Sequence, residues 1–312
     1  MNETRRYRVS RDHPFDRQSL IRLAEHQYAP ALVKVDHQLI CSIPWPANSA
    51  EPMSLELSEP MASDPVAAIC FLLAMTSINY RFWTLEPNGS VSRYCHVGKT
   101  GARALWASFE AAWGPNLHYG AELATRLRAD DFKTLFGLMP DQEGRLAILS
   151  ELLDPDKLQA VAQLLLADLR SNGKATVEQA AGLAAFFPLA FDDPYLKKAQ
   201  LALSMIAAVL RDTGIAVNVA DLTAFADYQV PRVLRALGVL DYSPSLADRV
   251  DHHHLLEEGG QEELSIRAAT IIACEAIAAH TGGTSADIDN LLWLSQDIAG
   301  ETPFHLTETR WY

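Results

Sequence analysis

The chain has 312 residues, of which 49% are hydrophobic and 21% charged, a composition that predicts a folded protein with a large core. Its 26 lysines and arginines stand against 39 aspartates and glutamates, which gives a formal net charge of −13. Such a charge repels phosphate backbones and so argues against broad binding to duplex DNA or to tRNA. A small phosphorylated ligand is still compatible with it where a few cations converge.

The cysteines and the apolar runs argue against three further classes of protein. Cys41, Cys70, Cys95 and Cys274 form no CxxC pair, so neither a zinc site nor a disulfide framework is indicated. The basic N-terminal stretch has no apolar region of the kind that a signal peptide carries. The longest apolar run, residues 67–75, is too short to span a bilayer. We therefore expect a cytoplasmic protein without a membrane association.

Hydrophobic periodicity predicts a mainly α-helical chain. We expect helices over residues 16–28, 64–83, 101–113, 123–136, 146–153, 158–169, 177–187, 195–210, 264–279 and 288–298, an extended or mixed stretch over 32–43, and a short strand over 91–97. Residues 45–62, rich in Pro, Ser and Ala, read as a connecting loop. The prediction is a single domain over 1–312, with an N-terminal segment and loop (1–62), a helical core (63–312) and at most a small β element in the N-terminal third.

Asp227 is the most distinctive candidate residue. It lies between Phe225 and Tyr228, just before Pro231 and an amphipathic helix whose apolar positions predict one buried face. Three interpretations stay open: an N-cap, because Asp is favoured at that boundary; a catalytic carboxylate tuned by the rings and the helix dipole; or an interaction site.

Other candidates carry weaker signals. Lys197 and Lys198 fall in the first turn of a helix, where the dipole disfavours cations, so they indicate either a solvated surface or a place for an anion. The triplet 252–254, three histidines, favours a solvated loop over a metal site, because adjacent histidines cannot all face one ion. Gly98-Lys99-Thr100 lacks the earlier glycine of a phosphate loop, where Arg93 stands. No nucleophile elbow and no dinucleotide-binding glycine motif is present.

At these residues the sequence resembles the queuosine salvage family, the queuosine 5′-phosphate N-glycosylases. The matching blocks follow the family's order and cover most of the chain from about residue 64 onward. They are Ser77-Ile78-Asn79-Tyr80-Arg81-Phe82-Trp83, Val97-Gly98-Lys99-Thr100 with Leu105-Trp106, Tyr195-Leu196-Lys197-Lys198-Ala199-Gln200, Phe225-Ala226-Asp227-Tyr228-Gln229-Val230-Pro231 with Leu237-Gly238, Ile266-Arg267 with Glu275, and the closing Pro303-Phe304-His305 to Trp311-Tyr312. The block around Asp227 is the most specific.

The resemblance implies an all-helical fold related to helix-hairpin-helix DNA glycosylases. It also implies hydrolysis of the N-glycosidic bond of queuosine 5′-monophosphate, which releases queuine for tRNA modification, without a metal or redox cofactor. Asp227 is then the catalytic carboxylate. The implied substrate-binding residues are Phe225, Tyr228, Lys197, Lys198, Asp289, Asn290, Arg267, Asn79 and Trp83. Among these we expect Lys197 to contact the phosphate.

This chain departs from the family pattern at positions that bear on the choice of base. Asn290 stands where the family has Tyr, Leu294 where it has a second Asp, and Gln229 where it has Arg. Alternative readings are therefore an N-glycosidase for a related (7-deaza)purine nucleotide, or a non-catalytic nucleotide-binding relative. A DNA-repair glycosylase is disfavoured by the negative charge. The sequence does not indicate an oligomeric state.

Overall fold

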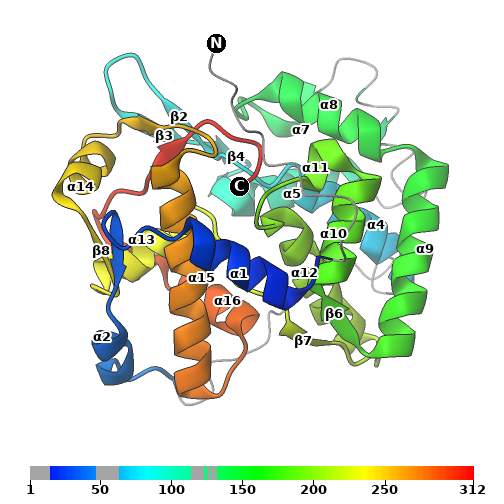
Figure 1. The fold of residues 1–312 in the computed structure, drawn as a ribbon. Helices are drawn as coiled ribbons and strands as arrows, with labels where there is room; N and C mark the ends of the chain where they lie inside the picture. Colours follow the sequence, from blue (N-terminus) through cyan, green and yellow to red (C-terminus); the bar gives the residue numbers. More distant parts are fainter. Residues whose placement is uncertain (1–14, 47–62, 114–122, 125–126, 128–131) are drawn as a thin grey trace, which may run out of the picture.

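The computed structural model describes residues 15–46, 63–113, 123–124, 127 and 132–312 (Figure 1). Its helices are α1 (Arg17–Gln27), α2 (His37–Ser42), α4 (Pro65–Ser77), α5 (Gly101–Trp113), α7 (Phe132–Phe136), α8 (Gln142–Leu152), α9 (Pro155–Asn172), α10 (Val177–Phe186), α11 (Pro188–Phe191), α12 (Lys197–Asp212), α13 (Gln229–Ala236), α14 (Pro244–Asp251), α15 (Gln261–Thr281), α16 (Ser285–Leu294) and the 3₁₀ turn η1 (Gln296–Ala299). The strands are β1 (Val33–Val35), β2 (Trp83–Leu85), β3 (Val91–Arg93), β4 (Cys95–His96), β5 (Lys99–Thr100), β6 (Lys174–Thr176), β7 (Asn218–Asp221), β8 (Leu240–Tyr242), β9 (Leu255–Leu256) and β10 (Leu306–Thr307). The mainly α-helical prediction is confirmed.

Two helices form the centre of the core. α4 is apolar on every side and buried from Ala67 to Ser77, and it packs against α12 and α9. α15 packs against α1, α2 and α16, and Figure 1 shows α1 crossing it. Among the described helices, α15 alone is long and apolar enough to cross a membrane by length and composition, yet most of it is buried inside the protein. It is therefore a core helix of this fold.

The predicted helix boundaries at prolines are confirmed. The Asp64 side chain accepts hydrogen bonds from the first backbone N–H groups of α4, and Pro65 occupies the first helical position. Asp154 and Pro155 start α9 in the same way and separate it from α8. These caps satisfy N–H groups that would otherwise lack a partner.

The predicted helix over 64–83 is too long, because α4 ends at Ser77. Two cations hold the carbonyl groups beyond that point. The Lys198 ammonium donates to the carbonyl of Ser77 at 2.7 Å, and Arg145 donates to the carbonyl of Tyr80. Arg81 then adopts a positive φ of 36°, which reverses the chain into β2. The partners that end this helix are distant in sequence, so the local pattern gave no sign of them.

The β structure is more widely distributed than predicted. Five two-stranded pairs occur in the described residues, three of them involving strands beyond residue 170. β1 pairs antiparallel with β8, and β10 pairs in parallel with β9. The expected strand over 91–97 is divided between the hairpins β2–β3 and β4–β5. These short ladders tie distant segments together at the edges of the helical core.

The remaining expectations fall on the ends and loops. The tail is docked as predicted, because the Tyr312 side chain is buried and the backbone N–H of Arg81 donates to the carbonyl of Tyr312 at 3.0 Å. His252 and His254 are exposed and His253 is half-buried just after α14, which confirms the solvated loop. Most of the predicted 45–62 loop, and much of the predicted 123–136 helix, lie outside the described residues.

Candidate active site

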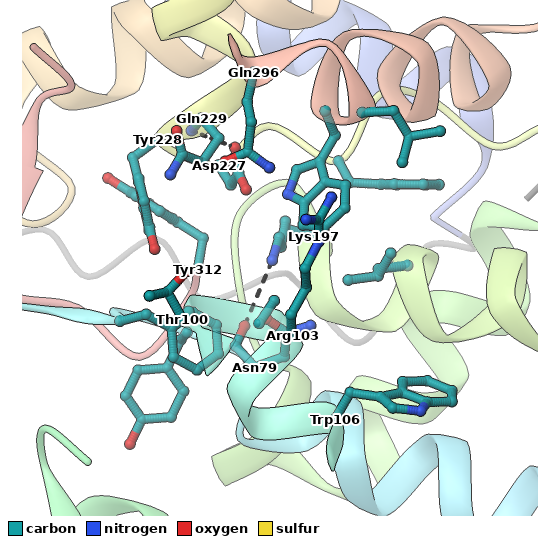
Figure 2. A pocket seen from close by; sticks show the side chains of 18 of the residues that line it. Asn79, Thr100, Arg103, Trp106, Lys197, Asp227, Tyr228, Gln229, Gln296 and Tyr312 are labelled. Carbon is teal, nitrogen blue, oxygen red and sulfur yellow. Dashed lines mark hydrogen bonds between the residues drawn. The ribbon is translucent and has the colours of Figure 1, made fainter. Parts of the chain in front are cut away.

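The described residues enclose a cavity of about 1070 Å³. Its walls come from α4, β2, β3, the start of α5, α12, the segment before α13, α16 with η1, and the tail. Figure 2 shows Asp227, Gln229 and Gln296 gathered at one end, Arg103 and Trp106 at the other, and Lys197 between them. Eight sequence-predicted residues line it: Asp227, Phe225, Tyr228, Lys197, Asp289, Asn290, Asn79 and Trp83.

Asp227 has both of the features that its sequence context left open. Its Oδ1 accepts hydrogen bonds from the backbone N–H groups of Gln229 at 2.6 Å and Val230 at 3.0 Å, so it caps the first turn of α13. The same carboxyl group lines the cavity and is 7% exposed. Capping therefore fixes the carboxylate in place and leaves it facing the space where a ligand would lie.

Asp289 is a second carboxyl group in the same wall. Its Oδ1 accepts a hydrogen bond from the backbone N–H of Phe225 at 2.9 Å, which ties α16 to the segment that carries Asp227. Burial, reinforced by the negative charge of Asp227, raises the pKa of Asp289 to about 8. At neutral pH Asp289 is therefore mainly protonated, and it brings a bound proton to the cavity.

Lys197 supplies the positive charge beside these acids. It is buried, and it interacts electrostatically with Asp227 and Asp289 while its Nζ lies 3.5 Å from the carbonyl oxygen of Asn79. Burial lowers the pKa of this lysine even though the neighbouring carboxylates favour its charged form. Of the two alternatives that the sequence left open for Lys197, its burial rules out the solvated surface. Its neighbourhood is rich in carboxyl groups, which makes it a poor phosphate contact.

Lys198 and Arg267, both predicted to bind the substrate, do not line the cavity. The Lys198 ammonium is buried over the ring of Tyr80, in addition to its bond with the Ser77 carbonyl. Arg267 is fully buried behind the wall, and its Nη2 bonds both carboxylate oxygens of Asp193 at 2.8 and 2.9 Å. On α12 the residues that line the cavity, Lys197, Leu201 and Met205, are spaced four apart and so share one face of the helix, whereas no residue of α15 lines it.

The start of α12 is held by Asp193. This carboxylate accepts from the backbone N–H groups of Tyr195 at 3.1 Å and Lys197 at 2.6 Å. Between them Leu196 has a φ of 54°, a left-handed conformation that costs a residue with a Cβ about 1–2 kcal/mol. The hydrogen bonds to Asp193 offset this cost, and they fix the backbone conformation at Lys197.

Aromatic rings form the wall opposite Lys197. Trp83, Tyr228 and Tyr312 belong to one buried cluster. The partly buried Phe304 packs against it, with its ring centroid 4.8 Å from that of Tyr228. Burial and the nearby Asp227 charge raise the pKa of the Tyr228 hydroxyl above its usual range, so it stays neutral. Flat apolar surfaces of this kind suit a planar base.

Three cations at the rim were not identified as ligand contacts from the sequence. Arg93, Lys99 and Arg103 line the cavity, are exposed, and form no ion pair within the described residues. Lys99 and Thr100 run directly into the N-terminus of α5, which adds a partial positive charge. The Gly98-Lys99-Thr100 motif is no phosphate loop, yet it places a cation and a helix end at the cavity.

Two carboxyl groups behind the wall also escaped the sequence analysis, although each had a local signal. Asp193 lies in an Asp-Asp-Pro turn, four residues before Lys197, where a side chain can accept from the first turn of a helix. Glu263 lies four residues before Arg267, a spacing that brings opposite charges together on a helix. Neither signal shows that the pair is buried.

Comparisons with known proteins show what this chain is similar to in sequence. Residues 194–312 match the family model described as Queuosine salvage protein. A Sphaerobacter thermophilus protein named queuosine 5′-phosphate N-glycosylase/hydrolase is 28% identical over 304 residues, which cover 90% of this chain and 93% of that protein. The chain is therefore similar to the queuosine salvage family over its C-terminal part, and to the Sphaerobacter thermophilus protein over most of its length.

Relatives from eukaryotes carry the same name. The Mus musculus protein is 26% identical over 72% of this chain and 71% of its own length, and the Dictyostelium discoideum protein is 24% identical over 78% and 77%. The queuosine salvage model begins one residue after Asp193 and includes Lys197, Asp227 and Asp289. The matched region therefore contains the end of the cavity formed by Lys197, Asp227 and Asp289, called the acidic end below. The cationic rim, formed by Arg93, Lys99 and Arg103, precedes the matched region in the sequence.

Proposed function

We propose that this protein hydrolyses the N-glycosidic bond of queuosine 5′-phosphate and releases the free base queuine for salvage into tRNA. The names of the relatives, which match up to 90% of the chain, support the substrate and the reaction. The observation that carries the proposal is the Asp227 carboxyl group, fixed by two backbone N–H groups and facing a large cavity beside a second acid and a lysine.

Asp227 would act where positive charge develops. Breaking the bond between the ribose C1′ and the base nitrogen passes through a state resembling an oxocarbenium ion. A carboxylate held close to C1′ stabilises that charge, and more strongly in a buried cavity than in water. Asp227 then either attacks C1′ to form a glycosyl ester that water hydrolyses in a second step, or orients the water that adds to C1′ and accepts its proton. In each case the sugar ends with a hydroxyl group on C1′.

Asp289 and Lys197 complete the acidic end. The departing 7-deazapurine lacks the N7 atom that could otherwise accept a proton, so the electron pair of the broken bond leaves a poor anionic group on the ring. Asp289 is protonated at neutral pH and would supply the proton that neutralises it. Lys197 offsets the negative charge that remains on the two acids.

The rim cations would hold the phosphate. Arg93, Lys99 and Arg103 are unpaired positive groups within the described part of an acidic protein, and they line the same cavity as Asp227. This assignment replaces the predicted role of Lys197, because a phosphate beside Lys197 would also lie close to the negative charge of Asp227. The aromatic wall of Tyr228, Phe304 and Tyr312 would take the base and the ribose.

Some finer features belong to the same proposal. We infer a single domain, supported by one hydrophobic cluster that includes residues from Leu20 to Ala299. A relation to the helix-hairpin-helix DNA glycosylases is inferred from the family resemblance alone. We also infer a cytoplasmic location and no metal or redox cofactor. The net charge of −13 supports a further inference, that the protein does not bind duplex nucleic acid. An N-glycosidase for a related nucleotide is a second candidate, because Asn290 and Leu294, which depart from the family pattern, line the cavity.

A substrate panel tests the proposed reaction. Purified protein is incubated with queuosine 5′-phosphate, queuosine, GMP and a damaged oligonucleotide, and free base is followed by chromatography. We expect release of queuine from queuosine 5′-phosphate, less from queuosine, and none from GMP or the oligonucleotide. Base release from GMP at a comparable rate would support the related-nucleotide candidate, and no release from any compound would support the non-catalytic relative.

Two substitutions at Asp227 separate catalysis from helix capping. Asp227→Asn keeps an Oδ1 acceptor for Gln229 and Val230, so we expect near-normal thermal stability and a loss of about 10²–10⁴ in kcat. Asp227→Ala also removes the cap and should lower the free energy of unfolding by about 1 kcal/mol. Turnover and melting temperature are measured for both. Near-normal turnover of Asp227→Asn would remove this carboxylate from the mechanism.

The pKa of Asp289 predicts an alkaline limit to activity. Its pKa of about 8 means that the proton-donating form is present below that pH and is lost above it, so kcat should fall about tenfold per pH unit on the alkaline side. Asp289→Asn should be slower throughout and should lack this alkaline decline. A variant with the same pH profile as the unaltered protein would show that another group limits the rate.

If the rim cations bind the phosphate, substitutions there should weaken binding of the nucleotide and leave binding of the nucleoside unchanged. Lys99→Ala and Arg103→Ala each remove a charged contact of about 1.5–3 kcal/mol, so KM for queuosine 5′-phosphate should rise at least about tenfold. KM for queuosine should stay within about twofold, because the nucleoside has no phosphate. Lys174→Ala, which removes an exposed cation on β6 that does not line the cavity, is the control. Equal effects on nucleotide and nucleoside would contradict the assignment.

A further inference from the structure

Arg267 connects the two halves of the acidic end without lining the cavity. Its Nε donates to the carbonyl of Ala226 at 2.9 Å, and Ala226 directly precedes Asp227. Its Nη2 bonds Asp193, which in turn accepts from the backbone N–H of Lys197 at 2.6 Å. One guanidinium group therefore joins the backbone next to Asp227 to the start of the helix that carries Lys197.

The surroundings of Arg267 leave it little freedom. The group is fully buried, its Nη1 lies 3.4 Å from Glu263 Oε1, and the rings of Tyr195 and Tyr312 lie 4.8 and 4.5 Å from its central carbon. Tyr312 also lines the cavity, and its hydroxyl bonds His305 at 3.0 Å. The guanidinium is planar with donors in fixed directions, so these contacts fix its Nε and Nη2 bonds together.

We propose that Arg267 is a positioning residue for base release, which sets the place of Asp227 relative to Lys197. This inference rests on the proposed function of Asp227. The carbonyl of Ala226 is part of the peptide bond that joins Ala226 to Asp227. Loss of its hydrogen bond with Arg267 would therefore let the Asp227 backbone shift. A misplacement of about 1 Å at a reacting group can cost on the order of 10²-fold in rate.

Arg267→Lys separates positioning from charge. Lysine keeps the positive charge beside Asp193 but has no Nε–H directed at the Ala226 carbonyl. We expect kcat to fall about 10-fold to 100-fold and KM to change less than about threefold, because no cavity-lining group is removed. Arg249→Lys is the matched control: Arg249 also bonds a carboxylate, Glu262, and a carbonyl, Leu255, but it contacts nothing beside the cavity.

The deciding experiment places Arg267→Lys in two backgrounds. Turnover is measured by mass spectrometry of released queuine, with Asp227 intact and with Asp227→Asn, at a temperature well below each variant's melting point. If Arg267 acts through the Asp227 carboxylate, the substitution costs 10-fold to 100-fold with Asp227 intact and less than about threefold in Asp227→Asn. An equal loss in both backgrounds, or no loss with Asp227 intact, would overturn the positioning role.

Two further variants distinguish failure of the positioning role of Arg267 from failure of the proposed role of Asp227. If Arg267→Lys does not fold, Asp193→Asn takes its place. This variant weakens the hold on the Lys197 backbone and must show the same dependence on Asp227, or the inference fails. Asp227→Asn alone reports on the proposed mechanism. If that variant keeps full turnover, both proposals fall, whereas an inactive Asp227→Asn with equal losses on changing Arg267 rejects only the positioning role.

Discussion

The contacts of Arg267 with its three partners join the segments that carry the site. A fully buried guanidinium is costly unless its donors and its charge are matched, and here Asp193, Glu263 and the Ala226 carbonyl match them. The partners come from three separate segments: the turn before α12, the segment before α13, and α15 itself. Because α15 is a central core helix, the site is fixed to the most buried part of the protein.

A local balance of charge follows from this arrangement. Asp227, Asp289 and Lys197 share the closed end of the cavity, and burial keeps one proton on Asp289. The opposite rim carries cations, although the whole chain has a net charge of −13. A ligand with an anionic end, a sugar and a flat base fits such a gradient, since each part meets a wall of suitable character.

Much of the helical fold was predictable because it follows from local sequence patterns. The starts of α4 and α9 follow from Asp-Pro pairs, and the long apolar stripes of α12 and α15 predict their burial. The end of α4 was not predictable, because Lys198 and Arg145, which hold the carbonyls there, are far from it in sequence. The strand pairs are too short to leave an alternating pattern.

The site residues also divide into those with a local sequence signal and those that only the fold brings together. Asp227 was found because it lies between rings at a helix start, and the structure adds that capping and exposure to the cavity coexist. The sequence did not tell which of Lys197 and Lys198 faces the cavity, because adjacent positions on a helix differ by about 100° and only the packing decides. Arg93 and Arg103 carried no motif at all, and only the fold brings them to the rim.

The most direct test is a crystal structure of the Asp227→Asn variant with intact queuosine 5′-phosphate. We predict that the ribose C1′ atom lies within about 3.5 Å of the residue 227 side chain, the distance of a reactive arrangement, with the phosphate at the cationic rim. A substrate bound with C1′ far from residue 227, or with its phosphate beside Lys197 and Asp289, would contradict the account.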